Sequence, residues 1–149
     1  MKISVTPFLW FDGHAAEAAN FYVSTFGRSK TTKILESNEV STSFEIHGIE
    51  MIAFNGGPHF KFNPAISMFV SCKTQAQVDR LWERLSKGGK KGQCGWLTDR
   101  YGLSWQIVPE VLGELMADSD EEEAARVSAA LMKMRKLDIS QLKRAHRGR

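Results

Sequence analysis

Residues 92–109 read Gly-Gln-Cys-Gly-Trp-Leu-Thr-Asp-Arg-Tyr-Gly-Leu-Ser-Trp-Gln-Ile-Val-Pro. Asp99 and Gly102 stand where a tight reversal of the chain favours these residue types, so we expect a turn between them. The segment 103–108 then alternates between two faces. The stretch therefore predicts a hairpin whose second strand carries one polar amide, Gln106, between apolar neighbours.

The residues before this hairpin predict a strand and a helix. Residues 65–72 are strand-like, and Thr74 is a typical N-cap for the helix that follows. An apolar stripe at helical spacing runs from Val78 to Leu85, and Gly88-Gly89 ends the helix. The second half thus has the order strand, helix, strands.

The first half repeats this order. We expect a strand over 3–11, a helix from Ala15 capped by Asp12, and an end to that helix at Gly27. Strands over 31–36, 41–47 and 49–54 follow, and residues 55–58 break the pattern. The prediction is an α+β fold of two tandem βαβββ modules, about 1–57 and 64–108, forming a curved mixed sheet around a pocket.

The chain after Pro109 predicts helices. We expect one over 110–117, a second capped by Asp120 with Lys133, Arg135 and Lys136 in its last turn, and a third over 138–145. The apolar stripe of the second helix comprises Val127, Ala130, Leu131 and Met134. We expect residues 1–110 to form one domain of paired modules and 111–149 to be its helical extension, which either covers a sheet edge or forms a dimer contact.

Composition excludes several classes of protein. The chain has 149 residues and a net charge of +3 spread along its length, so we expect no nucleic-acid face. No apolar run approaches the length of a membrane span, and the N-terminus lacks the pattern of a signal peptide, so we expect a cytoplasmic protein. The two cysteines form no CxxC pair, and we expect both to be reduced thiols.

Two side chains are candidates for catalysis. Cys94 lies beside a glycine and a tryptophan, but a nucleophilic thiol needs a base or positive charge, and a quiet buried thiol is the alternative. His59 follows a strand end between aromatic residues and would titrate near neutrality in a pocket, or else lie in water.

We favour a pocket that binds a small molecule over a catalytic site. Several aromatics fall on or beside strands, with Asn55, Asp99 and Gln106 as polar points. The ligand-binding residues we expect are Asn55, His59, Phe62, Trp96, Asp99, Trp105 and Gln106. His, Asp, Glu and Cys do not recur at matching places in the two modules, so we expect no bound metal ion. The pairs Gly56-Gly57 and Gly88-Gly89 do not fit GxGxxG, so we expect no dinucleotide or adenosylmethionine cofactor.

Motifs spread over nearly the whole chain resemble one family. They are Pro7–Gly13, Phe21-Tyr22, Asn55–Phe62, Cys94–Gly102, Ser104–Pro109 and Lys136–Ile139. The sequence resembles the PhnB-like proteins of the vicinal oxygen chelate superfamily, which includes glyoxalases, bleomycin-resistance proteins and extradiol dioxygenases. The resemblance implies paired βαβββ modules and a homodimer.

The same resemblance implies less about activity. The metal-ligand positions of metal-using members fall near Pro7, Asn55, Ala65 and Gln106, none of which is a His or Glu here. Members also carry the label of a 3-demethylubiquinone methyltransferase. We expect binding of a small, partly apolar molecule in a metal-free pocket. The alternatives are an enzyme of the glyoxalase, dioxygenase or methyltransferase type, and a non-catalytic structural or interaction protein.

Overall fold

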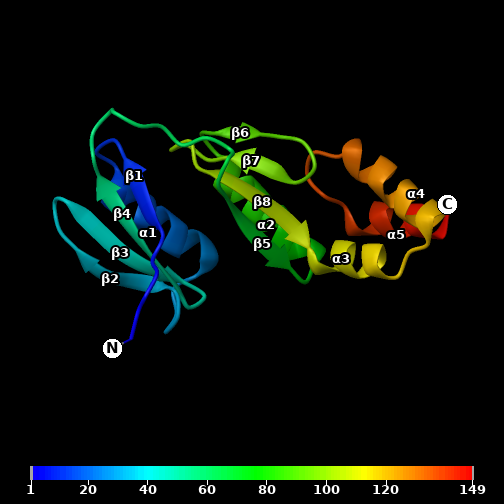
Figure 1. Cartoon of the computed structure of the whole chain (residues 1–149), viewed down its shortest axis with the longest axis horizontal. Coiled ribbons are helices and arrows are strands. Elements are labelled where there is room, and N and C mark those ends of the chain that lie inside the picture. The colour runs from blue at the N-terminus through cyan, green and yellow to red at the C-terminus, as the bar shows by residue number, and fades with distance from the viewer. Residues whose placement is uncertain (1, 149) are drawn as a thin grey trace. The chain divides into compact units, whose positions relative to one another are not determined.

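The computed structural model describes residues 2–148 and contains two compact units, one ending at Phe62 and one beginning at Asn63. Each unit has a four-stranded mixed sheet with a helix on one face (Figure 1). The expected α+β class and the repeated βαβββ order are confirmed. The pairing of the modules into one domain over 1–110 stays a prediction.

The first unit contains one helix and one sheet. Its elements are β1 (Phe8–Phe11), α1 (Ala15–Phe26), β2 (Lys33–Ser37), β3 (Ser41–Ile46) and β4 (Ile49–Asn55). The sheet order is β1-β4-β3-β2, in which β1 runs parallel to β4 and the other pairs are antiparallel. Ala18 and Ala19 are fully buried, so the small face of α1 packs closely on β3 and β4.

Two local predictions in this unit are wrong. The first strand begins at Phe8 and not at residue 3, since Ile3 and Val5 are exposed and only the Pro7 carbonyl joins the ladder, by accepting from the Ile52 N–H. Proline has no N–H to donate, which fits a strand that starts directly after it. The N-cap of α1 is His14 instead of Asp12, and its side chain makes no capping bond.

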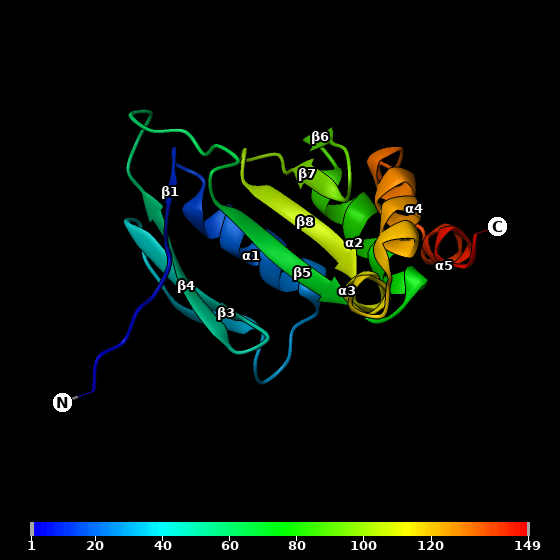
Figure 2. The ribbon, with the colours of Figure 1, turned by 45° about the vertical axis from the view of Figure 1, so that its right-hand side comes forward.

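The second unit repeats the same plan. Its first elements are β5 (Ser67–Cys72), α2 (Gln75–Ser86), β6 (Lys90–Lys91), β7 (Trp96–Thr98) and β8 (Ser104–Pro109). The sheet order is β5-β8-β7-β6, and β5 is parallel to β8 (Figure 2). Thr74 forms the predicted cap as part of a capping box with Gln77, in which each side chain accepts from the other residue's backbone N–H.

Three helices complete the second unit: α3 (Glu110–Ala117), α4 (Glu121–Met132) and α5 (Ile139–Arg147). Val108 packs into their small core with Val127, Met134, Leu137 and Leu142. The cap at Asp120 is confirmed. The prediction that Lys133, Arg135 and Lys136 lie in the last turn of α4 is wrong, because the helix ends at Met132.

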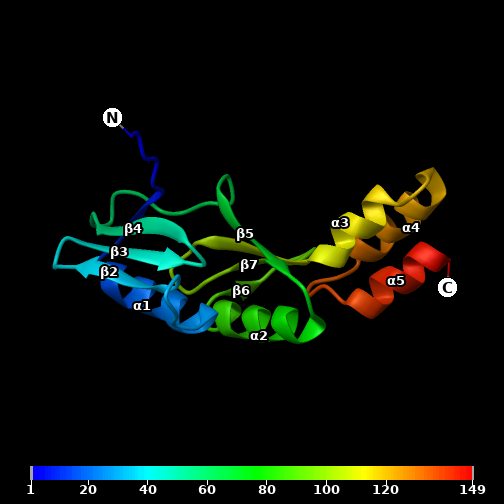
Figure 3. The same cartoon turned by 90° about the horizontal axis from the view of Figure 1, so that it is seen from below.

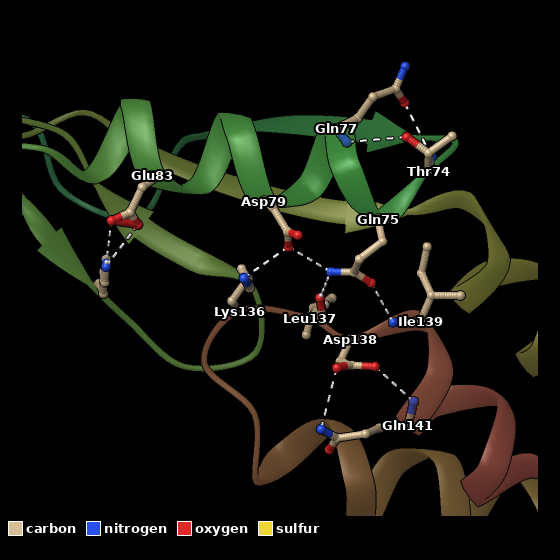
Figure 4. Close-up of polar contacts among 11 residues, drawn as sticks. Thr74, Gln75, Gln77, Asp79, Glu83, Lys136, Leu137, Asp138, Ile139 and Gln141 are labelled. Carbon is tan, nitrogen blue, oxygen red and sulfur yellow. Dashed lines mark hydrogen bonds and ion pairs between the residues drawn. The ribbon is translucent and has the colours of Figure 1, made fainter.

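The side chain of Gln75 attaches this helical segment to α2 (Figure 4). Its Nε2 donates to the Leu137 carbonyl and to Asp79 Oδ1, both at 2.9 Å, and its Oε1 accepts from the Ile139 N–H at 2.8 Å. Asp79 also pairs with Lys136 at 2.9 Å. One amide at the start of α2 therefore fixes the chain just before α5. Among residues 2–148, no helix combines the length and the apolar character needed to cross a bilayer.

Candidate functional site

One face of the second unit's sheet is covered by α2. The other face is not covered by any helix of residues 64–108. Leu97, Trp105 and Ile107 are buried at 2% exposure or less, and strand alternation puts Gln106 on the other side from Trp105 and Ile107. We call this other side the open face of the second unit. The sequence therefore supplies one polar side chain in the middle of β8, directed away from the core formed with α2.

Three neighbouring strands contribute a row of side chains to this open face. Gln106 lies directly opposite Phe69 on β5 and directly opposite Trp96 on β7. Side chains directly opposite one another share one face of a sheet. Phe69 is 62% exposed, and Trp96 and Gln106 are half-buried. An amide flanked by two aromatic rings results.

A serine orients the amide of Gln106. Gln106 Nε2 donates to Ser67 Oγ at 3.0 Å. One N–H of the amide is therefore engaged within the sheet, and Oε1 is an atom that can accept a hydrogen bond from another molecule. This arrangement is suited to a ligand with an apolar part and a hydrogen-bond donor.

Asp99 and Trp105 lie inside the second unit rather than on its open face, since each is 2% exposed. Asp99 Oδ1 accepts from the backbone N–H of Tyr101 at 2.8 Å and of Leu103 at 3.1 Å, and Oδ2 accepts from Trp105 Nε1 at 2.8 Å. The predicted turn is present and closes with Gly102 N–H donating to the Asp99 carbonyl at 3.0 Å. These contacts assign Asp99 a role in building the hairpin, and its expected contact with a ligand stays a prediction.

Aromatic rings also gather in the first unit, around Trp10. The Trp10 ring centroid lies 5.2 Å from that of Phe54 and 4.9 Å from that of Phe60, both edge-on. Trp10 Nε1 donates to the Gly57 carbonyl at 2.9 Å, and a Cβ on Gly56 would lie 2.1 Å from the indole ring. Glycine at 56 is therefore what allows the loop after β4 to cross this ring.

The other predicted residues of the first unit have separate surroundings. Asn55 Oδ1 accepts from the Ala15 N–H at 2.8 Å, and its Nδ2 donates to the Glu39 carbonyl at 3.0 Å, so this amide caps α1 from the end of β4. The Phe62 ring packs edge-on against Phe11 at 5.2 Å. His59 is exposed in the loop. The structure brings Trp96 and Gln106 together, and it joins Asp99 to Trp105.

Sequence reasoning missed Ser67 and Phe69 as members of the open face. Their positions follow from the parallel pairing of β5 with β8, and neither residue carries a local motif. The available signal was position alone, since Ser67, Phe69 and Ser71 alternate with Met68 and Val70 along the strand and so share one face.

The two cysteines occupy different surroundings. Cys72 is buried, and burial, with a smaller contribution from the Glu110 carboxylate, raises the pKa of its thiol. Cys94 is half-buried, with Sγ 3.5 Å from the Leu131 carbonyl oxygen and 3.8 Å from Met132 Sδ. Neither of these atoms is a base that generates a thiolate, so the contacts favour the quiet thiol over the nucleophile.

The residues at the four positions compared with metal-using relatives do not fit a transition-metal site. Pro7 has no donor side chain, Ala65 has none, and the amides of Asn55 and Gln106 are bonded as described above. Within residues 2–148, no group of three or more His, Cys, Asp or Glu side chains is arranged to hold a metal ion.

The chain matches a family model and several solved structures. The model of the 3-demethylubiquinone-9 3-methyltransferase family matches residues 3–108. No curated protein matches the sequence. The PhnB protein from Bacillus cereus is 30% identical, with 72% of this chain and 99% of that chain covered and a TM-score of 0.63.

Two further structures share the fold at lower identity. Protein PA1353 from Pseudomonas aeruginosa is 19% identical, with coverage of 73% and 98% and a TM-score of 0.58. The hypothetical protein SA1046 from S. aureus is 18% identical, with coverage of 70% and 92% and a TM-score of 0.51. The match over most of the chain agrees with the motifs that resemble PhnB-like proteins. The chain therefore belongs to the 3-demethylubiquinone-9 3-methyltransferase family of PhnB-like proteins.

Proposed function

We propose that this protein binds a small, partly apolar molecule on the open face of the second unit, without a metal or other cofactor. The observation that carries the proposal is the row Phe69–Gln106–Trp96, in which an amide oriented by Ser67 lies between two accessible aromatic rings. Aromatic side chains supply a large contact area for an apolar group. Gln106 Oε1 supplies the acceptor that orients it.

This geometry predicts the chemistry of the ligand. A planar ring or short apolar chain would lie on Trp96 and Phe69, and an N–H or O–H of the same molecule would donate to Gln106. A hydrogen bond of this kind contributes a net of about 0.5–1.5 kcal/mol, which corresponds to a change of about 2- to 12-fold in Kd.

Acetanilide, which has a ring and an N–H, is a suitable probe, and N-methylacetanilide is its matched control without the N–H. We expect acetanilide to shift the amide resonances of β5, β7 and β8 in a two-dimensional NMR titration, and to bind more tightly than the control. Trp96→Ala should weaken both probes. Gln106→Leu should abolish the preference between them and leave the binding of N-methylacetanilide unchanged.

Phe60→Ala is the control variant, because Phe60 belongs to the aromatic group around Trp10 in the first unit. It should leave the titration of the second unit unchanged. The proposal is contradicted if wild-type protein binds neither probe, or if the shifts fall outside β5, β7 and β8. Equal affinities for the two probes would contradict the role of Gln106.

A further inference from the structure

A groove of about 580 Å³ runs between α4 and α5, which lie side by side in the second unit (Figure 3). The helices are antiparallel, since a short connection joins them and His146 Nε2, near the end of α5, lies 3.4 Å from the carboxylate of Glu123, near the start of α4. Lys133 lines the groove at the end next to this connection. Arg126 lines it toward the opposite end, near the C-terminus of α5.

The groove has a cation at each end and methyl groups between them. Arg126 and Lys133 both line it, and they are seven positions apart on one helix face, or about 10.5 Å along the axis. Ala129 and Ala130 lie on the same face between them, and Ala145 lines the groove from α5. A ligand that matches this lining has an apolar middle and a negative charge at each end.

The guanidinium of Arg126 is held in place with donors left for a ligand. Its Nε donates to the Ala145 carbonyl at 2.9 Å, and its Nη2 donates to the His146 carbonyl at 2.8 Å. A guanidinium has five N–H groups, so three remain beyond these two bonds. Nη1 lies 3.5 Å from Glu122, whose side chain is 86% exposed, so this ion pair is weak. A fixed guanidinium with free N–H groups is suited to bind a carboxylate.

The other two cations of the lining have no such partner. Lys133 and Arg144 are exposed, and neither forms an ion pair with a residue of the described chain. Arg144 stands next to Ala145, which binds Arg126, so two cations serve this end of the groove and one serves the other. The described lining includes no carboxylate. The charge of this groove therefore favours an anion.

We propose that the α4/α5 groove binds an elongated aliphatic dicarboxylate. One carboxylate would lie on Arg126 and Arg144, the other on Lys133, and the methylene chain on the alanines between them. A compact anion such as phosphate would reach only one end, so the spacing of the cations selects the longer ligand. The groove lies beyond residue 108, where the family match ends, and shares no residue with the open face, so the inference is independent of the ligand-binding proposal.

A two-dimensional NMR titration of the full chain with three acids tests this site. Suberate is the elongated dicarboxylate, octanoate has the same chain with one carboxylate, and succinate is a dicarboxylate too short to reach both ends. We expect suberate to shift the amide resonances of α4 and α5. It should bind about 2- to 5-fold more tightly than octanoate, as one additional exposed ion pair allows, and more tightly than succinate.

Variants at exposed positions separate the two ends of the groove from its floor. Lys133→Gln should lower the affinity for suberate to that for octanoate and leave octanoate unchanged, because its single carboxylate binds at the arginine end. Arg144→Gln should weaken both ligands. Ala129→Leu should also weaken both, because the larger side chain fills the space of the methylene chain.

Lys143→Gln is the matched control, since Lys143 is an exposed cation of α5 outside the lining of the groove. It should leave both affinities unchanged, and circular dichroism should show that the variants retain their helices. The proposal is overturned if wild-type protein binds suberate no more tightly than octanoate, or if the shifts fall outside α4 and α5. It is also overturned if Lys133→Gln keeps the preference for suberate, or if Lys143→Gln weakens binding as much as Arg144→Gln does.

Discussion

Replacement of Asp99 by alanine should destabilise the second unit strongly. The carboxylate accepts from Tyr101 N–H, Leu103 N–H and Trp105 Nε1, and both Leu103 and Trp105 are 2% exposed. Two donors would therefore stay buried without an acceptor, at about 1–3 kcal/mol each, so we expect the free energy of unfolding to fall by about 4 kcal/mol. With a urea m-value of about 2 kcal/mol/M, the midpoint should shift by about 2 M.

Asp99→Asn distinguishes the bonds of this side chain to the backbone of the turn from its bond to the Trp105 ring. One amide oxygen can still accept from the backbone N–H groups of Tyr101 and Leu103, while the amide NH₂ would face the Trp105 N–H, donor against donor. We expect a loss of about 1–3 kcal/mol, which Trp105→Phe should reduce in a double-mutant cycle. Urea unfolding followed by far-ultraviolet circular dichroism and tryptophan fluorescence measures all four forms.

Two results would refute this reasoning. A loss below about 1 kcal/mol for Asp99→Ala would mean that the donors find other acceptors or reach water. Equal losses for Asp99→Asn and Asp99→Ala would mean that the backbone bonds to Oδ1 do not stabilise the turn. Either result would mean that apolar contacts, and not the hydrogen bonds of Asp99, stabilise the hairpin.

Two further predictions concern ionisable groups. Hydrogen bonds from Gln75 and, to a smaller extent, Lys136 lower the pKa of Asp79. The stabilisation by this carboxylate should therefore be present above about pH 4, the usual pKa of an unfolded aspartate, and be lost as the pH falls through the lowered pKa of the folded state. Hydrogen exchange of α5 should show this loss, and Asp79→Asn should remove the pH dependence. The buried Cys72 thiol, whose pKa is raised, should react with 5,5′-dithiobis(2-nitrobenzoate) at neutral pH only on unfolding, and Cys94 should react slowly; rapid reaction of the Cys72→Ser variant would show instead that Cys94 is an activated nucleophile.

The elements that were predictable from the sequence depend on local chemistry. The turn at Asp99 uses an aspartate side chain that bonds to backbone groups two and four residues later, and the caps at Thr74 and Asp120 use bonds three residues away. The bounds of α3, 110–117, agree with the prediction for the same reason, since Pro109 precedes the helix. In each case the partner lies within the same short stretch.

The features that sequence reasoning missed depend on distant partners. The start of β1 is set by its pairing with β4, and the cap of α1 comes from Asn55, forty residues after Ala15. The open face needs the order β5-β8-β7, which brings Phe69 and Trp96 to either side of Gln106. Strand order is a property of the folded unit and leaves no local pattern.

The parallel pairing of the first and last strand in each unit has a consequence for synthesis on the ribosome. Asn55 contacts Ala15 across 40 positions, and Gln106 contacts Ser67 across 39. The first strand of each unit therefore emerges long before its partner exists, and the helix that follows it cannot yet close onto a complete sheet. Each half of the nascent chain must remain incomplete for the time needed to translate about forty codons, which at about 5–20 residues per second is about 2–8 seconds.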